Sequence, residues 1–328
     1  MKLQRRAFVF VVAVLSLGAA AYSRNVDSGK SSSQNPSDSA TVFLGRWDLT
    51  LKAPDREYPS WLELSQENGQ LKAEMVGRWG NARQLPKVEI ANGHLKFVSP
   101  KEEEERQDDM VFEATLSGNR LSGTTTGPDG TVWPWIGERA PSLKRSGTPK
   151  WGKPIPLFNG KDLSGWTMSK SSSSSVWKVE NSNLITPGEG PELISDAKFQ
   201  DFKLHVEFNC EPTSNSGAYL RGRYEVQIET DSIAEPPSHH TGGVYGFLAP
   251  SPELPRTPGE WQTFDITLIG RKITIVQNGQ TIINNQEIPG ITGGALDSHE
   301  ELPGPIYLQG SEKGRVTYRN IVISPAAQ

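Results

Sequence analysis

The chain has 328 residues with 22% charged residues and a formal net charge of −4 at pH 7. This length suggests about two domains. The well-mixed charges lack the basic stripe of a nucleic-acid-binding protein, so we expect no nucleic-acid partner. The 32 Gly, 24 Pro and 9 Trp favour short strands joined by many turns.

Residues 1–21 have the layout of a secretory signal peptide. A positive start with Lys2, Arg5 and Arg6 precedes a short apolar run over 7–17 and then small residues. The apolar run is short for a membrane span, so a cleaved signal is favoured over an uncleaved anchor. We expect an exported protein, periplasmic or extracellular, without membrane attachment after cleavage.

The next segment, 22–40, is polar and is predicted to be a flexible linker. The single cysteine, Cys210, excludes an internal disulfide within the chain. It follows a strand-like run without a Cys-pairing motif, so we interpret it as a packed small residue rather than a nucleophile.

Residues 41–140 predict a small all-β accessory domain. About eight short apolar segments are separated by turns such as Asn68-Gly69 and Asn92-Gly93, and no helical period persists. This pattern is typical of a small antiparallel barrel or sandwich. The acidic run 102–105 is interpreted as a solvated loop rather than a metal site. The tryptophans of this segment fit core positions better than sugar platforms: Trp47, Trp61, Trp79, Trp133 and Trp135.

A Pro- and Lys-rich linker is predicted over 141–154, followed by a second domain over 155–328. Apolar and polar residues alternate along 202–209 and 264–268, and Asn278-Gly279 predicts a hairpin. One apolar face per strand, repeated over about ten strands, predicts a two-sheet sandwich.

The segment 219–229 reads as one strand with Arg221, Glu225 and Gln227 on its polar face. Glu225 and Glu229 would lie about 13–14 Å apart along such a strand, too far for the glycosidase carboxylate pair, which needs roughly 5–10 Å. The polar face is either a sugar-binding row or a solvated face with cross-strand ion pairs.

The Gly- and Pro-rich segment 231–260 holds Asp231, His239, His240 and Tyr245. A loop of this length in a compact domain is usually functional or disordered. Adjacent histidines on extended backbone cannot both face one site, so at most one of them is expected to act as a base, acid or metal ligand.

Several motifs in order resemble the 3-keto-disaccharide hydrolase family, long classed as a domain of unknown function. The resemblance covers about 155–325, and its motifs include 157–166 (LFNGKDLSGW), 215–217 (NSG), 224–228 (YEVQI), 259–261 (GEW), 303–310 (PGPIYLQG) and 318–321 (YRNI). It implies a concanavalin A-like β-sandwich, or jelly roll, with a sugar site on its concave sheet. It also implies activity on glycosides that carry a ketone at C3. Where the family usually has Asp soon after the Gln-Ile pair, this chain has Glu229-Thr230-Asp231.

The chemistry that this resemblance implies needs one base, one group that stabilises an enolate oxygen, and groups that position a sugar. Glu225, Glu207 and His239 are candidate bases, and Arg221 or a bound divalent metal ion could stabilise the oxygen. The remaining candidates orient hydroxyl groups or, for the tryptophan, stack on a ring: Asn215, Gln227, Tyr245, Gln309 and Trp261. Two alternatives stay open, a lectin-like carbohydrate binder without catalysis and a structural surface protein. The sequence does not predict an oligomeric state.

Overall fold

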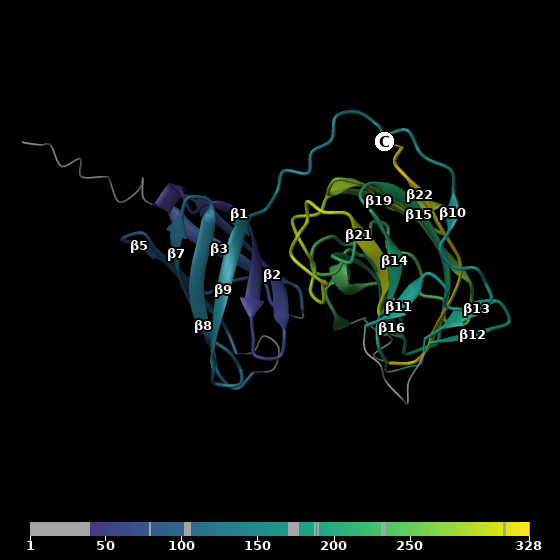
Figure 1. The fold of residues 1–328 in the computed structure, drawn as a ribbon, viewed down its shortest axis with the longest axis horizontal. Helices are drawn as coiled ribbons and strands as arrows, with labels where there is room; N and C mark the ends of the chain where they lie inside the picture. Colours follow the sequence, from purple (N-terminus) through teal and green to yellow (C-terminus); the bar gives the residue numbers. More distant parts are fainter. Residues whose placement is uncertain are drawn as a thin grey trace, which may run out of the picture. The chain divides into compact units, whose positions relative to one another are not determined.

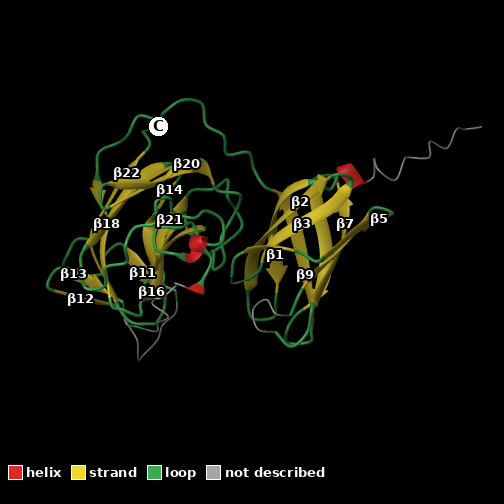
Figure 2. Cartoon of the chain, turned by 180° about the vertical axis from the view of Figure 1, so that it is seen from behind, coloured by secondary structure: helices red, strands yellow, loops and turns green. Residues whose placement is uncertain are grey.

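The computed structural model describes residues 40–327 except 79, 102–105, 170–176, 187, 189, 231–233 and 311–312. The predicted signal peptide, nearly all of the first linker, the acidic run, Trp79 and Asp231 lie outside the described residues. The described chain is all-β, as predicted, and its strands fall into two groups, over 45–139 and 155–325 (Figures 1 and 2). Among the described residues, no helix has the length and apolar character needed to cross a bilayer.

The first group is one antiparallel sheet of nine described strands: β1 (Gly45–Lys52), β2 (Glu57–Glu67), β3 (Gln70–Val76), β4 (Ala82–Gln84), β5 (Lys87–Ala91), β6 (His94–Ser99), β7 (Met110–Ser117), β8 (Arg120–Thr126) and β9 (Val132–Arg139). Their order is β4-β3-β2-β1-β9-β8-β7-β6-β5. The Leu85 N–H, between the two edge strands in sequence, donates to the Ala73 carbonyl of β3 at 2.8 Å. Beyond this pair, β5 at one edge of the sheet also contacts β3 near the other edge, so the sheet curls back toward its own start, as a small barrel does.

Large aromatic side chains fill the core of this first sheet. The Phe97 and Phe112 rings stack with centroids 4.7 Å apart. The four described tryptophans are at most 3% exposed, which confirms the prediction that they are core residues: Trp47, Trp61, Trp133 and Trp135. Because each indole removes a large apolar area from water, Trp47, Trp133 and Trp135 hold the curled sheet together, whereas Trp61 packs with the apolar cluster of the sandwich.

The second group contains thirteen described strands: β10 (Ile155–Pro156), β11 (Trp166–Met168), β12 (Lys178–Glu180), β13 (Asn183–Ile185), β14 (Leu193–Phe199), β15 (Phe202–Cys210), β16 (Asn215–Leu220), β17 (Tyr224–Glu229), β18 (Gln262–Ile269), β19 (Lys272–Gln277), β20 (Gln280–Glu287), β21 (Gly304–Leu308) and β22 (Val316–Pro325). A short 3₁₀ helix, η3 (Pro237–His239), follows β17.

These strands form two sheets, which confirms the predicted sandwich. One has the order β12-β13-β22-β15-β18-β19-β20 with β10 paired to β22, and the other has the order β11-β14-β21-β16-β17. Alternate residues such as Val206 and Phe208 of β15 and Val226 and Ile228 of β17 belong to one buried apolar cluster. Cys210 also lies in this core, where burial raises the pKa of its thiol to about 12, as expected of a packed residue.

The prediction of one strand over 219–229 is wrong, because the chain reverses direction inside it. Arg221 and Gly222 have φ angles of 53° and 67°, and the Arg223 N–H donates to the Leu220 carbonyl at 3.0 Å. Two consecutive positive φ angles are typical of the tight turn that joins two hairpin strands. Periodicity hid this turn because Leu220 and Tyr224, on either side of it, both face the core.

Candidate active site

Three polar side chains of β17 lie on the face of the five-stranded sheet that is turned away from the core. Glu225, Gln227 and Glu229 alternate with core residues, yet they are only 3%, 2% and 7% exposed. The register places Tyr219 of β16 directly opposite Glu225, and Asn215 opposite Glu229. The alternative of a solvated outer face is therefore wrong for this strand, because loops cover it.

The long loop after β17 forms much of this cover. The Gln227 N–H donates to the Gly243 carbonyl at 2.9 Å, and the Tyr245 N–H donates to the Glu225 carbonyl at 3.1 Å. From another loop, the Thr292 hydroxyl accepts the Glu225 N–H at 3.1 Å. The backbone of β17 is thus bonded along both sides, which fixes where its side chains point.

A tyrosine holds the Glu225 carboxylate. The Tyr219 hydroxyl lies 2.8 Å from Glu225 Oε2 and 2.9 Å from the Gly293 carbonyl oxygen. The Tyr219 ring stacks on the Tyr307 ring of β21 with centroids 4.2 Å apart. Burial, followed by the nearby Glu225 charge, raises the pKa of Tyr219 well above its usual value. The hydroxyl therefore stays protonated and acts as a hydrogen-bond donor.

Gly217 leaves the space that this carboxylate occupies. A Cβ atom at Gly217 would lie 2.2 Å from Glu225 Oε1, which is closer than any real contact. The Asn-Ser-Gly motif over 215–217 thus has a packing reason for its glycine.

His239, in η3, is buried and stacks on the Tyr245 ring with centroids 4.2 Å apart. Its Nδ1 lies 3.3 Å from Glu235 Oε2, which favours a proton on Nδ1 and leaves a lone pair on Nε2. Burial is the largest effect on His239 and lowers its pKa, so the ring is neutral near pH 7. His240 turns to different partners, with its Nδ1 2.8 Å from Glu253 Oε1.

Among the described residues, the buried polar atoms without a hydrogen-bond partner include His239 Nε2 and Gln309 Oε1. Gln309 directly follows β21 and is one alternation beyond Tyr307, and its N–H donates to the Gly217 carbonyl at 2.9 Å. Buried polar groups are normally satisfied, so unsatisfied ones call for an explanation such as a ligand.

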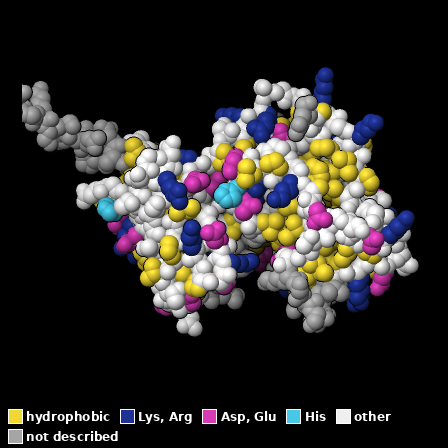
Figure 3. All heavy atoms as spheres, viewed as in Figure 1, with side chains coloured by type: hydrophobic (Ala, Val, Ile, Leu, Met, Phe, Trp, Pro, Cys, Tyr) yellow, Lys and Arg dark blue, Asp and Glu magenta, His cyan; other side chains and the backbone are white. Residues whose placement is uncertain are grey.

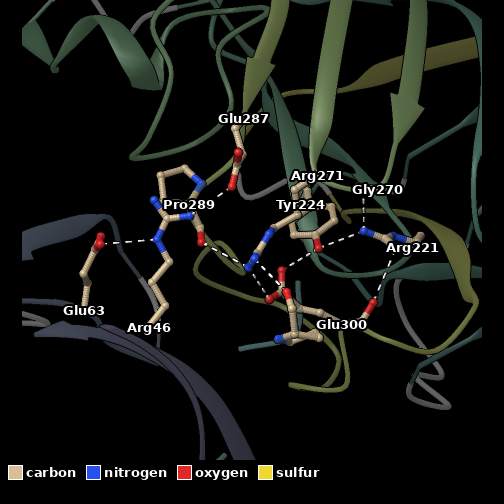
Figure 4. Close-up of polar contacts among 10 residues, drawn as sticks. Arg46, Glu63, Arg221, Tyr224, Gly270, Arg271, Glu287, Pro289 and Glu300 are labelled. Atoms are coloured by element: carbon tan, nitrogen blue, oxygen red, sulfur yellow. Dashed lines mark hydrogen bonds and ion pairs between the residues drawn. The ribbon is translucent and has the colours of Figure 1, made fainter. Parts of the chain in front are cut away.

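Arg221 does not join this group. Its fully buried guanidinium donates to the Tyr224 hydroxyl and to the Gly270 carbonyl, both at 2.9 Å. The same hydroxyl donates to Glu300, which also pairs with Arg271 at 2.9 Å (Figure 4). Because Arg221 lies in the turn, its side chain supports a buried network rather than the face that carries Glu225.

Glu207 and Trp261 lie with the other sheet. Glu207 belongs to β15, and its two oxygens accept hydrogen bonds from Arg319 and Asn320, each at 2.6 Å. The Arg319 guanidinium lies 3.8 Å from the centroid of the Trp261 ring. These residues therefore contact one another rather than Glu225.

The structure thus places most of the predicted site residues on or around the five-stranded sheet: Asn215, Glu225, Gln227, His239, Tyr245 and Gln309. Sequence reasoning missed Tyr219 and Tyr307. The signal was the alternation of each with a core leucine, Leu220 or Leu308, which puts the tyrosine on the opposite face.

The described residues of this site do not form a metal-binding group. Among the described residues, no group of three or more His, Cys, Asp or Glu side chains is arranged to hold one. The lone pair of His239 Nε2 could bind a metal ion, but the described residues do not bring further metal ligands together around it. We therefore derive no chemical step through a metal.

The fold defines a β-sandwich protein, and the family match makes it a carbohydrate-active one. The family model for the 3-keto-alpha-glucoside-1,2-lyase-like domain matches residues 153–324, just over half of the chain. The chain belongs to that family, which confirms the resemblance seen in its motifs. No curated protein matches the chain.

Solved structures give more distant likenesses. A candidate glycosyl hydrolase from Parabacteroides distasonis ATCC 8503 is 27% identical with a TM-score of 0.43, over 55% of this chain and 92% of the other. A second one from that organism is 24% identical with a TM-score of 0.41, over 52% and 98%. The carbohydrate-binding module CBM66 from Bacillus subtilis is 11% identical with a TM-score of 0.33, over 49% and 95%.

Proposed function

We propose that this protein cleaves glycosides whose sugar ring carries a ketone at C3. One observation carries the proposal: the buried Glu225 carboxylate is fixed by Tyr219 on a sheet face where His239 Nε2 and Gln309 Oε1 lack partners. A neutral sugar offers hydroxyl groups that can satisfy such atoms, and a fixed carboxylate can take a proton. Membership in the 3-keto-alpha-glucoside-1,2-lyase-like family supports this choice of substrate.

The proposed reaction begins with transfer of the C2 proton to Glu225, which leaves an enolate across C2, C3 and the ketone oxygen. The enolate then forms the C1–C2 double bond and breaks the C1–O bond, and the departing oxygen takes a proton. Water adds afterwards, with its oxygen at C1 and a proton at C2. This sequence needs a single base, so it is compatible with Tyr219, rather than a carboxylate, standing opposite Glu225 in the strand register.

The other side chains are assigned by their positions. His239 Nε2 accepts a hydrogen bond from a sugar hydroxyl or serves as the alternative base, because the neutral ring has a lone pair there. Tyr245, stacked on His239, is the proposed donor to the enolate oxygen. Gln227, Asn215 and Gln309 orient the remaining hydroxyls. Arg221, Glu207 and Trp261 have no part in this scheme, because they contact other groups.

Incubation of the pure protein with 3-keto-disaccharides in D₂O tests the scheme. We expect monosaccharide release with deuterium at C2 of the product, and no action on the same disaccharides without the ketone. Glu225→Gln should lower kcat by roughly 100-fold or more, whereas Glu207→Gln, a matched change on the other sheet, should leave kcat within about two-fold of wild type.

Other results would contradict the proposal in distinct ways. Binding of the sugars without turnover would support the lectin-like alternative, and neither binding nor turnover would support a structural role. Product without deuterium at C2 would indicate direct hydrolysis instead of elimination.

We also infer export from the layout of residues 1–21. Fractionation of the producing cells tests this: we expect the mature chain in the periplasm or medium, starting near residue 22. An intact N-terminus in the cytoplasm would contradict it.

A further inference from the structure

A cavity lies where the first sheet meets the sandwich. It has a volume of about 130 Å³, and Arg56, Tyr58 and Arg78 line it from the first sheet and its loops. Glu192 and Tyr307 line it from the sandwich. Since one water needs roughly 10–15 Å³ on this measure, the space suits one small ring rather than an oligosaccharide.

The first-sheet wall of this cavity is organised in advance. The rings of Tyr58 and Trp133 stack with centroids 5.9 Å apart at 9°. Arg56 lies 4.5 Å and Arg78 5.2 Å from the Tyr58 ring centroid. The Tyr58 hydroxyl donates to Asp55 at 2.6 Å. Guanidinium groups held on aromatic faces keep their hydrogen-bond donors in fixed directions. Little side-chain conformational entropy is therefore lost when a ligand binds.

The sandwich wall connects directly to the proposed base. Tyr307, which lines the cavity, stacks on Tyr219, and the Tyr219 hydroxyl contacts Glu225. Gly294, also in the wall, donates its N–H to the Arg78 carbonyl at 3.2 Å. Two residues earlier, Thr292 accepts the Glu225 N–H. One short segment therefore touches both the first-sheet wall and the strand that carries Glu225.

Close packing fixes the first sheet in this position. Trp61 of β2 is fully buried and meets the Phe247 ring edge-on with centroids 5.3 Å apart. A Cβ at Gly290 would lie 2.2 Å from the Trp61 indole, and one at Gly246 would lie 2.6 Å from Asn81 Cβ. Glycine at both positions allows this approach, so the first sheet packs directly against the sandwich beside the cavity.

We propose that the first sheet supplies the subsite for the second sugar ring of the glycoside, the ring that departs from C1. This inference rests on the proposed function. The cavity wall carries two basic side chains, Arg56 and Arg78, and two acidic ones, Glu57 and Glu192, so its charges cancel. Basic and acidic side chains are also interspersed on the face of the molecule drawn in Figure 3. The ligand that fits is therefore a neutral pyranose, with Tyr307 offering aromatic surface and the charged groups binding hydroxyls.

The test compares two substrates that share the 3-keto ring: a 3-keto-disaccharide and the corresponding methyl 3-keto-glycoside, which has no second ring. For the double variant Arg56→Ala/Arg78→Ala, we expect the ratio of kcat/KM for disaccharide over methyl glycoside to fall about ten-fold or more, equivalent to roughly 1.4 kcal/mol. Arg120→Ala, at an exposed position of β8 outside the cavity, is the control and should leave the ratio unchanged. Leu296→Trp, which fills the cavity from the sandwich side, should lower the ratio in the same way.

The outcomes separate the two proposals. An active wild type with an unchanged ratio in both the double variant and Leu296→Trp overturns the subsite and leaves the proposed function standing. A wild type inactive on both substrates overturns the proposed function, and the subsite with it. If the double variant unfolds, the Leu296→Trp ratio decides.

Discussion

The Tyr219 hydroxyl donates to the Glu225 carboxylate from the directly opposite position on the neighbouring strand, at 2.8 Å. The two residues are six apart in the chain, and the turn at Arg221 and Gly222 brings them face to face. A short hairpin thus carries both the proposed base and the group that aims it. Cross-strand pairs of this kind are set by register, so small errors in the turn would separate them.

Tyr219→Phe tests this pairing. The Phe ring keeps the stack on Tyr307, but Glu225 Oε2 loses its buried donor. We expect kcat to fall about ten-fold or more, and the free energy of unfolding to fall by about 1–3 kcal/mol. Tyr318→Phe is the matched control, because it removes a buried hydroxyl that contacts Ser216 instead. Equal losses of kcat in the two variants would contradict the role of Tyr219.

Gly217→Ala tests the space beside the carboxylate. The added methyl group would overlap Glu225 Oε1, so the carboxylate must move. We expect a substantial loss of kcat with the far-UV circular dichroism spectrum retained. Because both changes act on one group, adding Gly217→Ala to Glu225→Gln should cost little further activity. Additive losses would show that the alanine acts elsewhere.

Alternation along the chain correctly placed Glu225 and Gln227 on one polar face, because that pattern depends only on neighbouring residues. It could not reveal the turn at Arg221, since core residues flank it on both sides. The alternation also could not show that Glu207 and Glu225 belong to different sheets. That separation depends on β15 pairing with β18 and β22, which are distant in sequence. Which sheet a strand joins is a non-local property, and one sequence carries little information on it.

The pH dependence of stability should change in His239→Gln. Burial lowers the folded-state pKa of His239 below its usual value of 6.5, so between these two values the unfolded chain binds more protons. This contribution to stability is present above about pH 6.5 and is lost as the pH falls. Urea unfolding at about pH 7.5 and about pH 5 should show that wild type loses more stability than the variant on acidification. Parallel losses would contradict a titrating His239.

For Asp48, in β1, the contribution to stability should change with pH in the opposite direction. Burial, and then the charge of Glu300, raise the pKa of Asp48 from 3.8 to about 9. The folded protein therefore holds a proton that the unfolded chain releases, and this stability is lost as the pH rises from about 4 toward about 9. Asp48→Asn cannot titrate, so its stability relative to wild type should increase between about pH 5 and about pH 8.5. A constant difference in urea unfolding would contradict this assignment.

Trp61 belongs to the first sheet in sequence, yet it is counted among the side chains that form the sandwich core. An excised fragment limited to residues 153–324 would lack that indole, and Phe247 and Gly290 would border the gap it leaves. Such a fragment would lose the ring that contacts Phe247 edge-on and would expose more apolar surface, which promotes aggregation. The stretch that a family match outlines is therefore smaller than the stretch that must fold together, and expression should begin upstream of β1.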